Sequence, residues 1–119
     1  MNAYTAIREH YRLSQEQWAR AFGVARSTVS AWESSGAHPP PVAVGAYRKL
    51  QEPLRRGDYT AVQNTRAQLL AIADQAEQEA DRLNRGRLEE TAIGKVVAVS
   101  AAAIAIGMLL AYLFEDKKR

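Results

Sequence analysis

Side chains that could perform catalysis are few in this sequence and are poorly placed to act together. His10 and His38 are the only histidines, and their separation does not place them on one helix face as metal ligands would require. The chain has no cysteine, which excludes thiol catalysis, disulfides and thiolate metal sites. No Ser and Asp form a nucleophile and base pair, and "RRGDY" contains no phosphate-binding loop. The sequence therefore predicts a protein that is not an enzyme and that holds no metal or cofactor.

The most informative stretch is "SQEQWARAFGVARSTVSAWE", which predicts two helices joined by a tight turn. Ser14 followed three residues later by Gln17 is a capping-box pattern, so a helix should begin at about Gln15. Gly23 can adopt the left-handed conformation that ends this helix and turns the chain sharply.

A second helix is expected from about Arg26 to Glu33 or Ser34. Apolar side chains at helical spacing would form one shared core between the two helices: Trp18, Phe22, Val24, Val29 and Trp32, with the small Ala19 at the crossing point. This is a helix-turn-helix arrangement.

Over roughly residues 3–52 the sequence resembles the phage-repressor family of helix-turn-helix domains, the Cro and Xre type. The resemblance rests on "RLSQEQWA" and "GVARSTVSAWE", on the prolines at 39–41, and on a following helix that contains Tyr47 and Leu50. It implies a small all-α head that binds double-stranded DNA.

The resemblance also implies which residues touch DNA. Arg26, Ser27 and Thr28 occupy the first turn of the recognition helix, which enters the major groove. Ser30 and Ala31 would face the groove one turn later. Arg26 is the leading base reader because a guanidinium can bond both acceptors of guanine, and Ala31 suits a thymine methyl.

Three further positions match the family in structural roles. Gln15 stands where relatives have a polar residue that touches a phosphate and braces the recognition helix. Arg8 and Glu33 match a pair that forms an internal salt bridge in many relatives. The sequence departs from the pattern at two positions. Ala25 cannot cap the recognition helix with a side-chain oxygen, and Gly36 lies further after Glu33 than the corresponding glycine of relatives does.

Composition is compatible with one small domain and appendages. The chain has 119 residues and a net charge of +3. Residues 1–60 hold eight Arg or Lys against five acids, whereas residues 61–91 hold four against six. A mildly basic head suits a polyanion partner.

Residues 53–91 read as a hinge followed by one long polar or amphipathic helix. Pro53 and Gly57 mark the hinge, and the stretch after it is rich in Ala, Gln, Glu, Arg and Leu. Its apolar positions approach a seven-residue repeat: Val62, Leu69, Ala73, Ala76, Ala80 and Leu83. The repeat favours either a coiled coil with a second copy or a single packed or solvent-bridging helix, and Arg66 interrupts the apolar seam.

Residues 92–114 are expected to form a transmembrane helix, with a charged tail at 115–119. No charge occurs from Val96 to Phe114, and these nineteen residues would span about 28 Å as a helix. This predicts a single-pass protein of a bacterial inner membrane with its N-terminal domain in the cytoplasm. Ala103, Gly107 and Ala111 recur at four-residue spacing and suggest a face for helix pairing in lipid.

Three functions fit these observations. The first is a membrane-tethered, sequence-specific DNA-binding protein, a transcriptional regulator or a DNA–membrane tether, acting as a homodimer. The second is a membrane-anchored protein-interaction module whose head binds a cytoskeletal or other protein partner. The third is a soluble oligomeric regulator whose C-terminal helix is buried between subunits.

Overall fold

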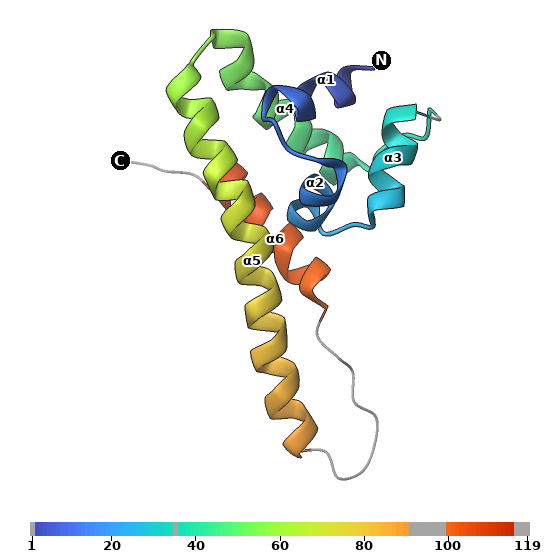
Figure 1. Ribbon diagram of the computed structural model, residues 1–119, viewed down its shortest axis with the longest axis vertical. Coiled ribbons are helices and arrows are strands. Elements are labelled where there is room, and N and C mark those ends of the chain that lie inside the picture. Colours follow the sequence, from blue (N-terminus) through green and yellow to red (C-terminus); the bar gives the residue numbers. More distant parts are fainter. Residues whose placement is uncertain (1, 35, 91–99, 116–119) are drawn as a thin grey trace.

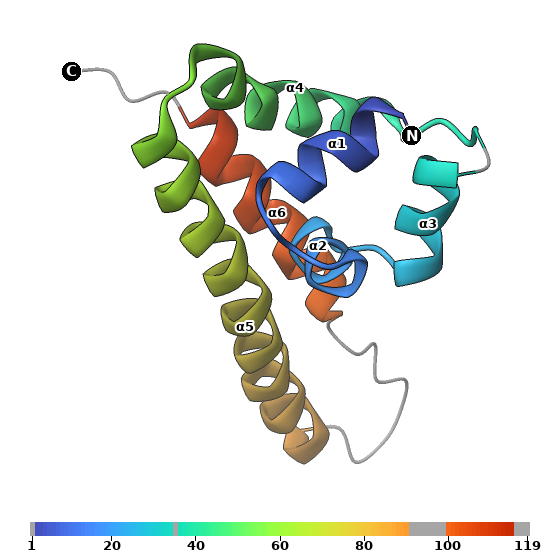
Figure 2. The same cartoon turned by 45° about the horizontal axis from the view of Figure 1, so that its top comes forward.

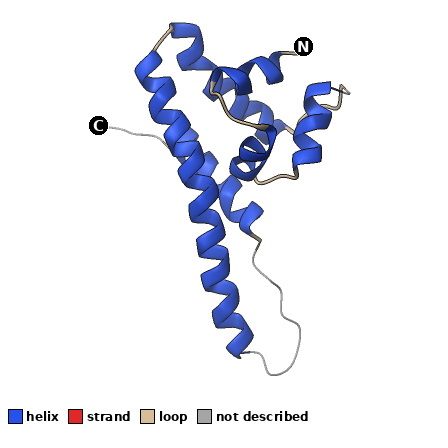
Figure 3. Cartoon of the chain, viewed as in Figure 1, coloured by secondary structure: helices blue, strands red, loops and turns tan. Residues whose placement is uncertain are grey.

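The protein is all-helical in the part of the chain that the structure describes (Figures 1 and 3). The structure is a computed structural model that describes residues 2–34, 36–90 and 100–115, with the backbone alone for residues 86–90. Its helices are α1 Ala3–His10, α2 Gln15–Phe22, α3 Arg26–Ser34, α4 Pro41–Arg56, α5 Tyr59–Glu90 and α6 Ala101–Phe114.

Side-chain caps start the first helices. The Ser14 hydroxyl accepts from the Gln17 amide at 3.1 Å, and the Gln17 side chain accepts from the Ser14 amide at 2.9 Å, so the predicted capping box is confirmed. Asn2 caps α1 by accepting from the Thr5 amide at 3.0 Å. Its Nδ2 also donates to the Trp32 carbonyl at 2.8 Å, which ties the start of α1 to α3.

Aromatic side chains form the centre of the head. The rings of Trp18, Phe22 and Tyr47 lie 5.1–5.8 Å apart, and the indole nitrogen of Trp18 donates to the Tyr47 hydroxyl at 2.9 Å. The Tyr11 hydroxyl donates to the Leu50 carbonyl. Burial raises the pKa of Tyr11 to about 12, so this hydroxyl keeps its proton near neutral pH and remains a donor.

Helix α4 continues past the predicted end of the head at residue 52. Pro53 lies inside the helix and is buried, and α4 ends at Gly57, which adopts a left-handed conformation with φ of 67°. Burial of the proline ring offsets the backbone hydrogen bond that a proline cannot donate. The break between the head and the long helix is therefore at Gly57 and Asp58.

Helix α5 is the predicted long helix, and its apolar positions pack within the same chain. Val62, Leu69 and Ala76 are buried in one cluster with residues of the head and of α6. Figure 2 shows α6 lying between α5 and α2. The seven-residue repeat thus serves a single packed helix, because its apolar side is already covered without a second copy.

The predicted transmembrane helix is overturned for the residues that the structure describes. Among them no helix is both long and apolar enough to cross a bilayer. The prediction of a single-pass protein of the inner membrane, which depended on such a helix, was therefore wrong. Helix α6 has 14 residues, about 21 Å against a hydrocarbon core of about 30 Å. It begins at Ser100, whose hydroxyl accepts from the amides of Ala102 and Ala103 at 3.1 and 3.4 Å. The remainder of the predicted span, residues 92–99, lies outside the described residues.

One side of α6 packs against α2, α4 and α5. On that side Ala105 and Leu109 are buried, with exposed fractions of 1% and 0%. The predicted membrane face of Ala103, Gly107 and Ala111 does form one side of α6, but it lies on a docked helix and is exposed. Burial against these helices accounts for the apolar residues on that side of α6.

The docking of α6 can be measured through Leu109. We expect Leu109→Ala to lower the free energy of unfolding by about 2–4 kcal/mol, because it removes a fully buried side chain from the joint core. Urea unfolding followed by circular dichroism measures the change. Ala111→Ser, at an exposed position of the same helix, is the matched control and should change stability by less than about 0.5 kcal/mol. Equal stabilities of the two variants would show that α6 is not docked.

The turn between α1 and α2 contains a strained residue. Arg12 has φ of 56°, the one positive φ outside glycine in the described part of the chain. Arg66 of α5 supports this turn: its Nε donates to the Tyr11 carbonyl at 2.9 Å and its Nη2 to the Arg12 carbonyl at 3.4 Å. The residue that interrupts the apolar seam of α5 is therefore a brace for the start of α2.

Removing the β-carbon of Arg12 should relieve this strain. We expect Arg12→Gly to be more stable than Arg12→Ala by about 0.5–1 kcal/mol, because alanine retains the β-carbon that disfavours left-handed backbone. Thermal and urea unfolding of the two variants gives the difference. An alanine variant as stable as the glycine variant would contradict the strain.

Candidate nucleic-acid interface

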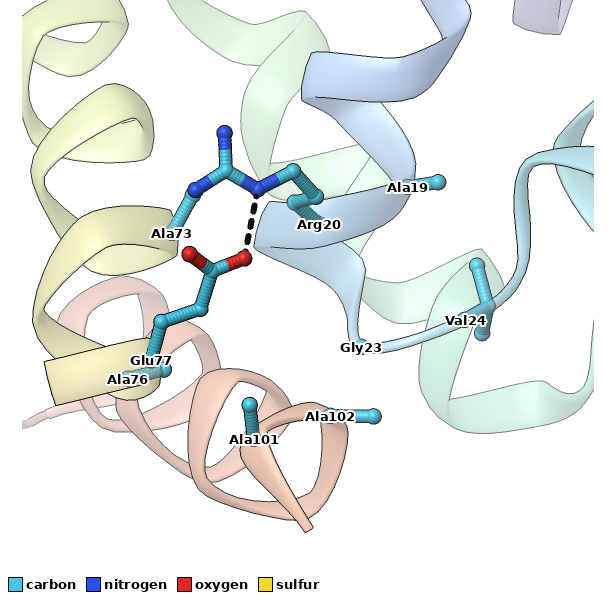
Figure 4. A pocket seen from close by; sticks show the side chains of 9 residues that line it. All are labelled: Ala19, Arg20, Gly23, Val24, Ala73, Ala76, Glu77, Ala101 and Ala102. Atoms are coloured by element: carbon cyan, nitrogen blue, oxygen red, sulfur yellow. Dashed lines mark hydrogen bonds and ion pairs between the residues drawn. The ribbon is translucent and has the colours of Figure 1, made fainter. Parts of the chain in front are cut away.

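The turn between α2 and α3 depends on glycine for two reasons. Gly23 has φ of 71°, and the amide of Val24 donates to the Ala19 carbonyl at 3.0 Å, which closes α2. A β-carbon on Gly23 would also lie 2.2 Å from the Ala102 carbonyl oxygen of α6. Figure 4 shows Gly23 and Val24 beside the first turn of α6. The turn is thus fixed by its own conformation and by the helix packed against it.

A charged contact holds α2 against α5 on the same side. Arg20 pairs with Glu77 at 2.9 Å and with Asp74 at 3.2 Å. Figure 4 shows the Arg20 and Glu77 side chains facing each other at the edge of a pocket of about 160 Å³ between α2, α5 and α6. These groups are largely exposed, so they contribute little stability.

Helix α3 presents two chemically different sides. Val29 and Trp32 are buried, with exposed fractions of 0% and 4%, and anchor the helix in the head. Arg26 and Ser27 are exposed at its first turn. The amides of Thr28 and Val29 donate to the carbonyl of Ala25, the residue before α3, at 3.0 and 3.3 Å. The first turn of α3 is therefore closed by backbone hydrogen bonds.

The side chains expected to touch DNA therefore lie where an approaching duplex could reach them. Arg26 and Ser27 are exposed, whereas Thr28, Ser30 and Ala31 are half-buried along the same helix. Their ability to contact bases stays a prediction. Gln15, at the first position of α2, is linked to the other end of α3 by its bond to Glu33.

A polar network centred on Glu33 fixes α3 to α1 and α2. Arg8 donates to both carboxylate oxygens of Glu33, from Nε at 2.7 Å and from Nη2 at 2.9 Å. The side-chain Nε2 of Gln15 donates to Glu33 Oε1 at 3.1 Å. Arg8 Nη1 also donates to the Leu13 carbonyl at 2.8 Å. The Arg8 and Glu33 side chains are only 12% and 4% exposed. Arg8 and Glu33 thus form the internal ion pair that the resemblance implies, and Gln15 braces α3.

The network changes the acidity of its members. Burial alone would raise the pKa of Glu33, but hydrogen bonds from Arg8 and Gln15, with the charge of Arg8, hold it below its usual range. The hydrogen bond to Glu33 raises the pKa of Arg8. Both groups are therefore charged at neutral pH.

Sequence reasoning missed Arg12 as a feature of this surface. Arg12 is exposed two residues before Ser14, the cap of α2, so its charge lies close to the start of that helix. The one hint in the sequence was Arg66, a basic residue among the apolar positions of α5. Its hydrogen bonds to the α1–α2 turn explain why a charged side chain fits at that position.

No metal-binding group was found in the described part of the chain, where no three His, Cys, Asp or Glu side chains come together. His10 and His38 are both exposed.

Comparison with known proteins identifies the same segment. A family model described as helix-turn-helix matches residues 6–46, about a third of the chain. The match runs from α1 into α4 and includes the whole of α2 and α3. No curated protein and no solved structure matches the chain. Residues 6–46 are therefore similar in sequence to helix-turn-helix proteins, and the structure gives this segment two helices joined by a glycine turn.

The Glu33 network makes stability depend on pH. Since the folded pKa of Glu33 lies below its unfolded value, the unfolded state binds the proton more readily, and the contribution of the pair is lost as pH falls through the folded pKa. We expect acidification below the ordinary glutamate range to destabilise the protein more than it destabilises Glu33→Gln. Urea unfolding at a series of pH values measures the two profiles. Parallel profiles would show that Glu33 does not carry the shift.

Proposed function

We propose that this protein is a DNA-binding regulator that reads a specific sequence with α3. One observation carries the proposal: the first turn of α3 exposes Arg26 and Ser27 while Val29 and Trp32 lock the opposite side into the core. An α-helix fits the major groove of B-DNA, where each base pair presents a distinct pattern of donors and acceptors. The match to helix-turn-helix proteins supports the same conclusion.

Each exposed side chain has a chemical role in this proposal. Arg26 donates two hydrogen bonds to O6 and N7 of a guanine. Ser27, Thr28 and Ser30 bond base edges or phosphate oxygens, and the Ala31 methyl packs on a thymine methyl. Gln15 approaches a phosphate from the start of α2 while its amide nitrogen remains bonded to Glu33.

The Arg8–Glu33–Gln15 network supports this role by holding α2 and α3 in one geometry. A recognition helix that is already positioned loses less conformational freedom on binding, so more of the contact energy appears as affinity. Two copies of the chain would engage two half-sites, as helix-turn-helix dimers do. Arg12 would add a phosphate contact beside α2.

Arg26 provides the test of sequence reading. The full chain is used to select sites from a random duplex library, and binding to the selected site is then measured by fluorescence anisotropy at several salt concentrations. We expect Arg26→Ala to weaken binding to the selected site by about 10- to 100-fold, because a bidentate guanine contact contributes about 1–3 kcal/mol. Binding to unrelated duplex should fall far less.

Arg55→Ala is the matched control. It removes the same charge from an exposed position near the end of α4 that is remote from α3 in sequence. It should leave discrimination between the two duplexes unchanged. A wild-type chain that enriches no sequence, or an Arg26→Ala variant that discriminates as well as wild type, would reject the proposal.

A further inference from the structure

The outward side of α6 is apolar and is exposed among the residues that the structure describes. Ala103, Gly107, Ala111 and Phe114 are exposed and lie within about 80° of one another around the helix, opposite the buried Leu109. We call these four residues the outer face of α6. A β-carbon on Gly107 would meet no atom within 4 Å, so the centre of the outer face is open.

None of the four side chains of the outer face is polar, and the Lys49 ammonium lies over the Phe114 ring at one end of it. Phe114 is 47% exposed, and from Ala101 to Phe114 the only side chain with a polar group is Tyr112. The hydroxyl of Tyr112 lies 3.5 Å from that of Thr65 on α5, so it belongs to the packed side of the helix. A continuous apolar face of this kind is expected to be covered by a partner.

The order of small residues suits a second copy in the opposite direction. Ala103 and Ala111 lie four residues on either side of Gly107, so the row reads the same from either end. When two such helices cross antiparallel at Gly107, each Ala103 meets the other copy's Ala111. The small side chains let the helix axes approach to about 8 Å, the close end of the usual range. A two-fold dimer requires this self-complementarity.

Charges at the two ends of α6 fit the same arrangement. At the C-terminal end, the Lys49 ammonium lies 5.5 Å from the centre of the Phe114 ring. At the other end, Asp74 and Glu77 share one Arg20, which leaves an excess of one negative charge beside Ala101. An antiparallel copy brings the basic end of each chain to the acidic end of its partner.

We propose that the outer face of α6 is a homodimer interface, with a second copy packed antiparallel across a two-fold axis at Gly107. The interface would bring together the two heads that the proposed DNA binding requires. Its test involves no DNA, so dimerisation and DNA binding can fail independently.

The absence of native cysteine allows a direct geometric test by disulfide crosslinking. A residue on the two-fold axis meets its own copy, so Gly107→Cys should form a disulfide-linked dimer under mild oxidation of the full chain. In the antiparallel dimer, Ala103 lies about 12 Å along the axis from the other copy's Ala103, beyond the roughly 7 Å that a disulfide can bridge. Ala103→Cys and Ala111→Cys should therefore crosslink poorly alone and efficiently when mixed.

Sedimentation equilibrium tests the interface without crosslinking. We expect the wild-type chain to dimerise at about 10–100 µM, typical of a small interface, and Ala111→Glu to raise the dissociation constant at least 10-fold. Ala37→Glu makes the same substitution at an exposed position between α3 and α4 and is the matched control. Circular dichroism should be the same for both variants, because both positions are exposed.

Charge reversal tests the direction of packing. Lys49→Glu should weaken the dimer, and adding Glu77→Lys to the same chain should restore much of the loss. The proposal is overturned by a wild-type monomer at about 100 µM, which would leave the outer face to a partner of another kind. It is also overturned if Ala103→Cys and Ala111→Cys each crosslink with themselves as well as Gly107→Cys does, since that pattern belongs to parallel helices.

Discussion

The close contact between Gly23 and Ala102 is the constraint on which the rest of the structure depends. Gly23 sets the angle between α2 and α3 through its left-handed backbone, and the carbonyl of Ala102 occupies the space that any β-carbon would need. The angle of α3 and the position of the start of α6 are therefore determined at the same point. Any larger side chain there would have to move one of the two.

Glu33 also holds α3 in position, through a buried polar network. An ion pair removed from water pays a large desolvation cost, so its presence is a weak argument for stability by itself. Its value here is geometric, because the two carboxylate oxygens bond Arg8 of α1 and Gln15 of α2 at once. Helix α3 is held near its C-terminal end by this network and at its N-terminal end by the glycine turn.

Local chemistry made the helix-turn-helix predictable, and long-range packing made the C-terminal part unpredictable. The Ser14–Gln17 capping box and Gly23 are read within a few residues, and each acts as expected. The nineteen uncharged residues before Glu115 have the composition of either a membrane span or a buried helix. For Ala101–Phe114 the outcome depends on the burial of Leu109 in the core that α6 shares with α2 and α5, which no local pattern encodes. The role of Arg66 was hidden for the same reason.

The merging of the head with α5 and α6 has a consequence for cooperativity. Buried residues of the matched segment, such as Trp18 and Phe22, belong to one continuous cluster with Leu69 and Leu109. Residues 6–46, which match the helix-turn-helix family model, are consequently only part of the unit that folds cooperatively. Excised on its own, this segment would leave one side of α2 uncovered, so the natural foldon includes the long helix and the C-terminal one. Partial unfolding of α6 should therefore reduce the order of α3 as well.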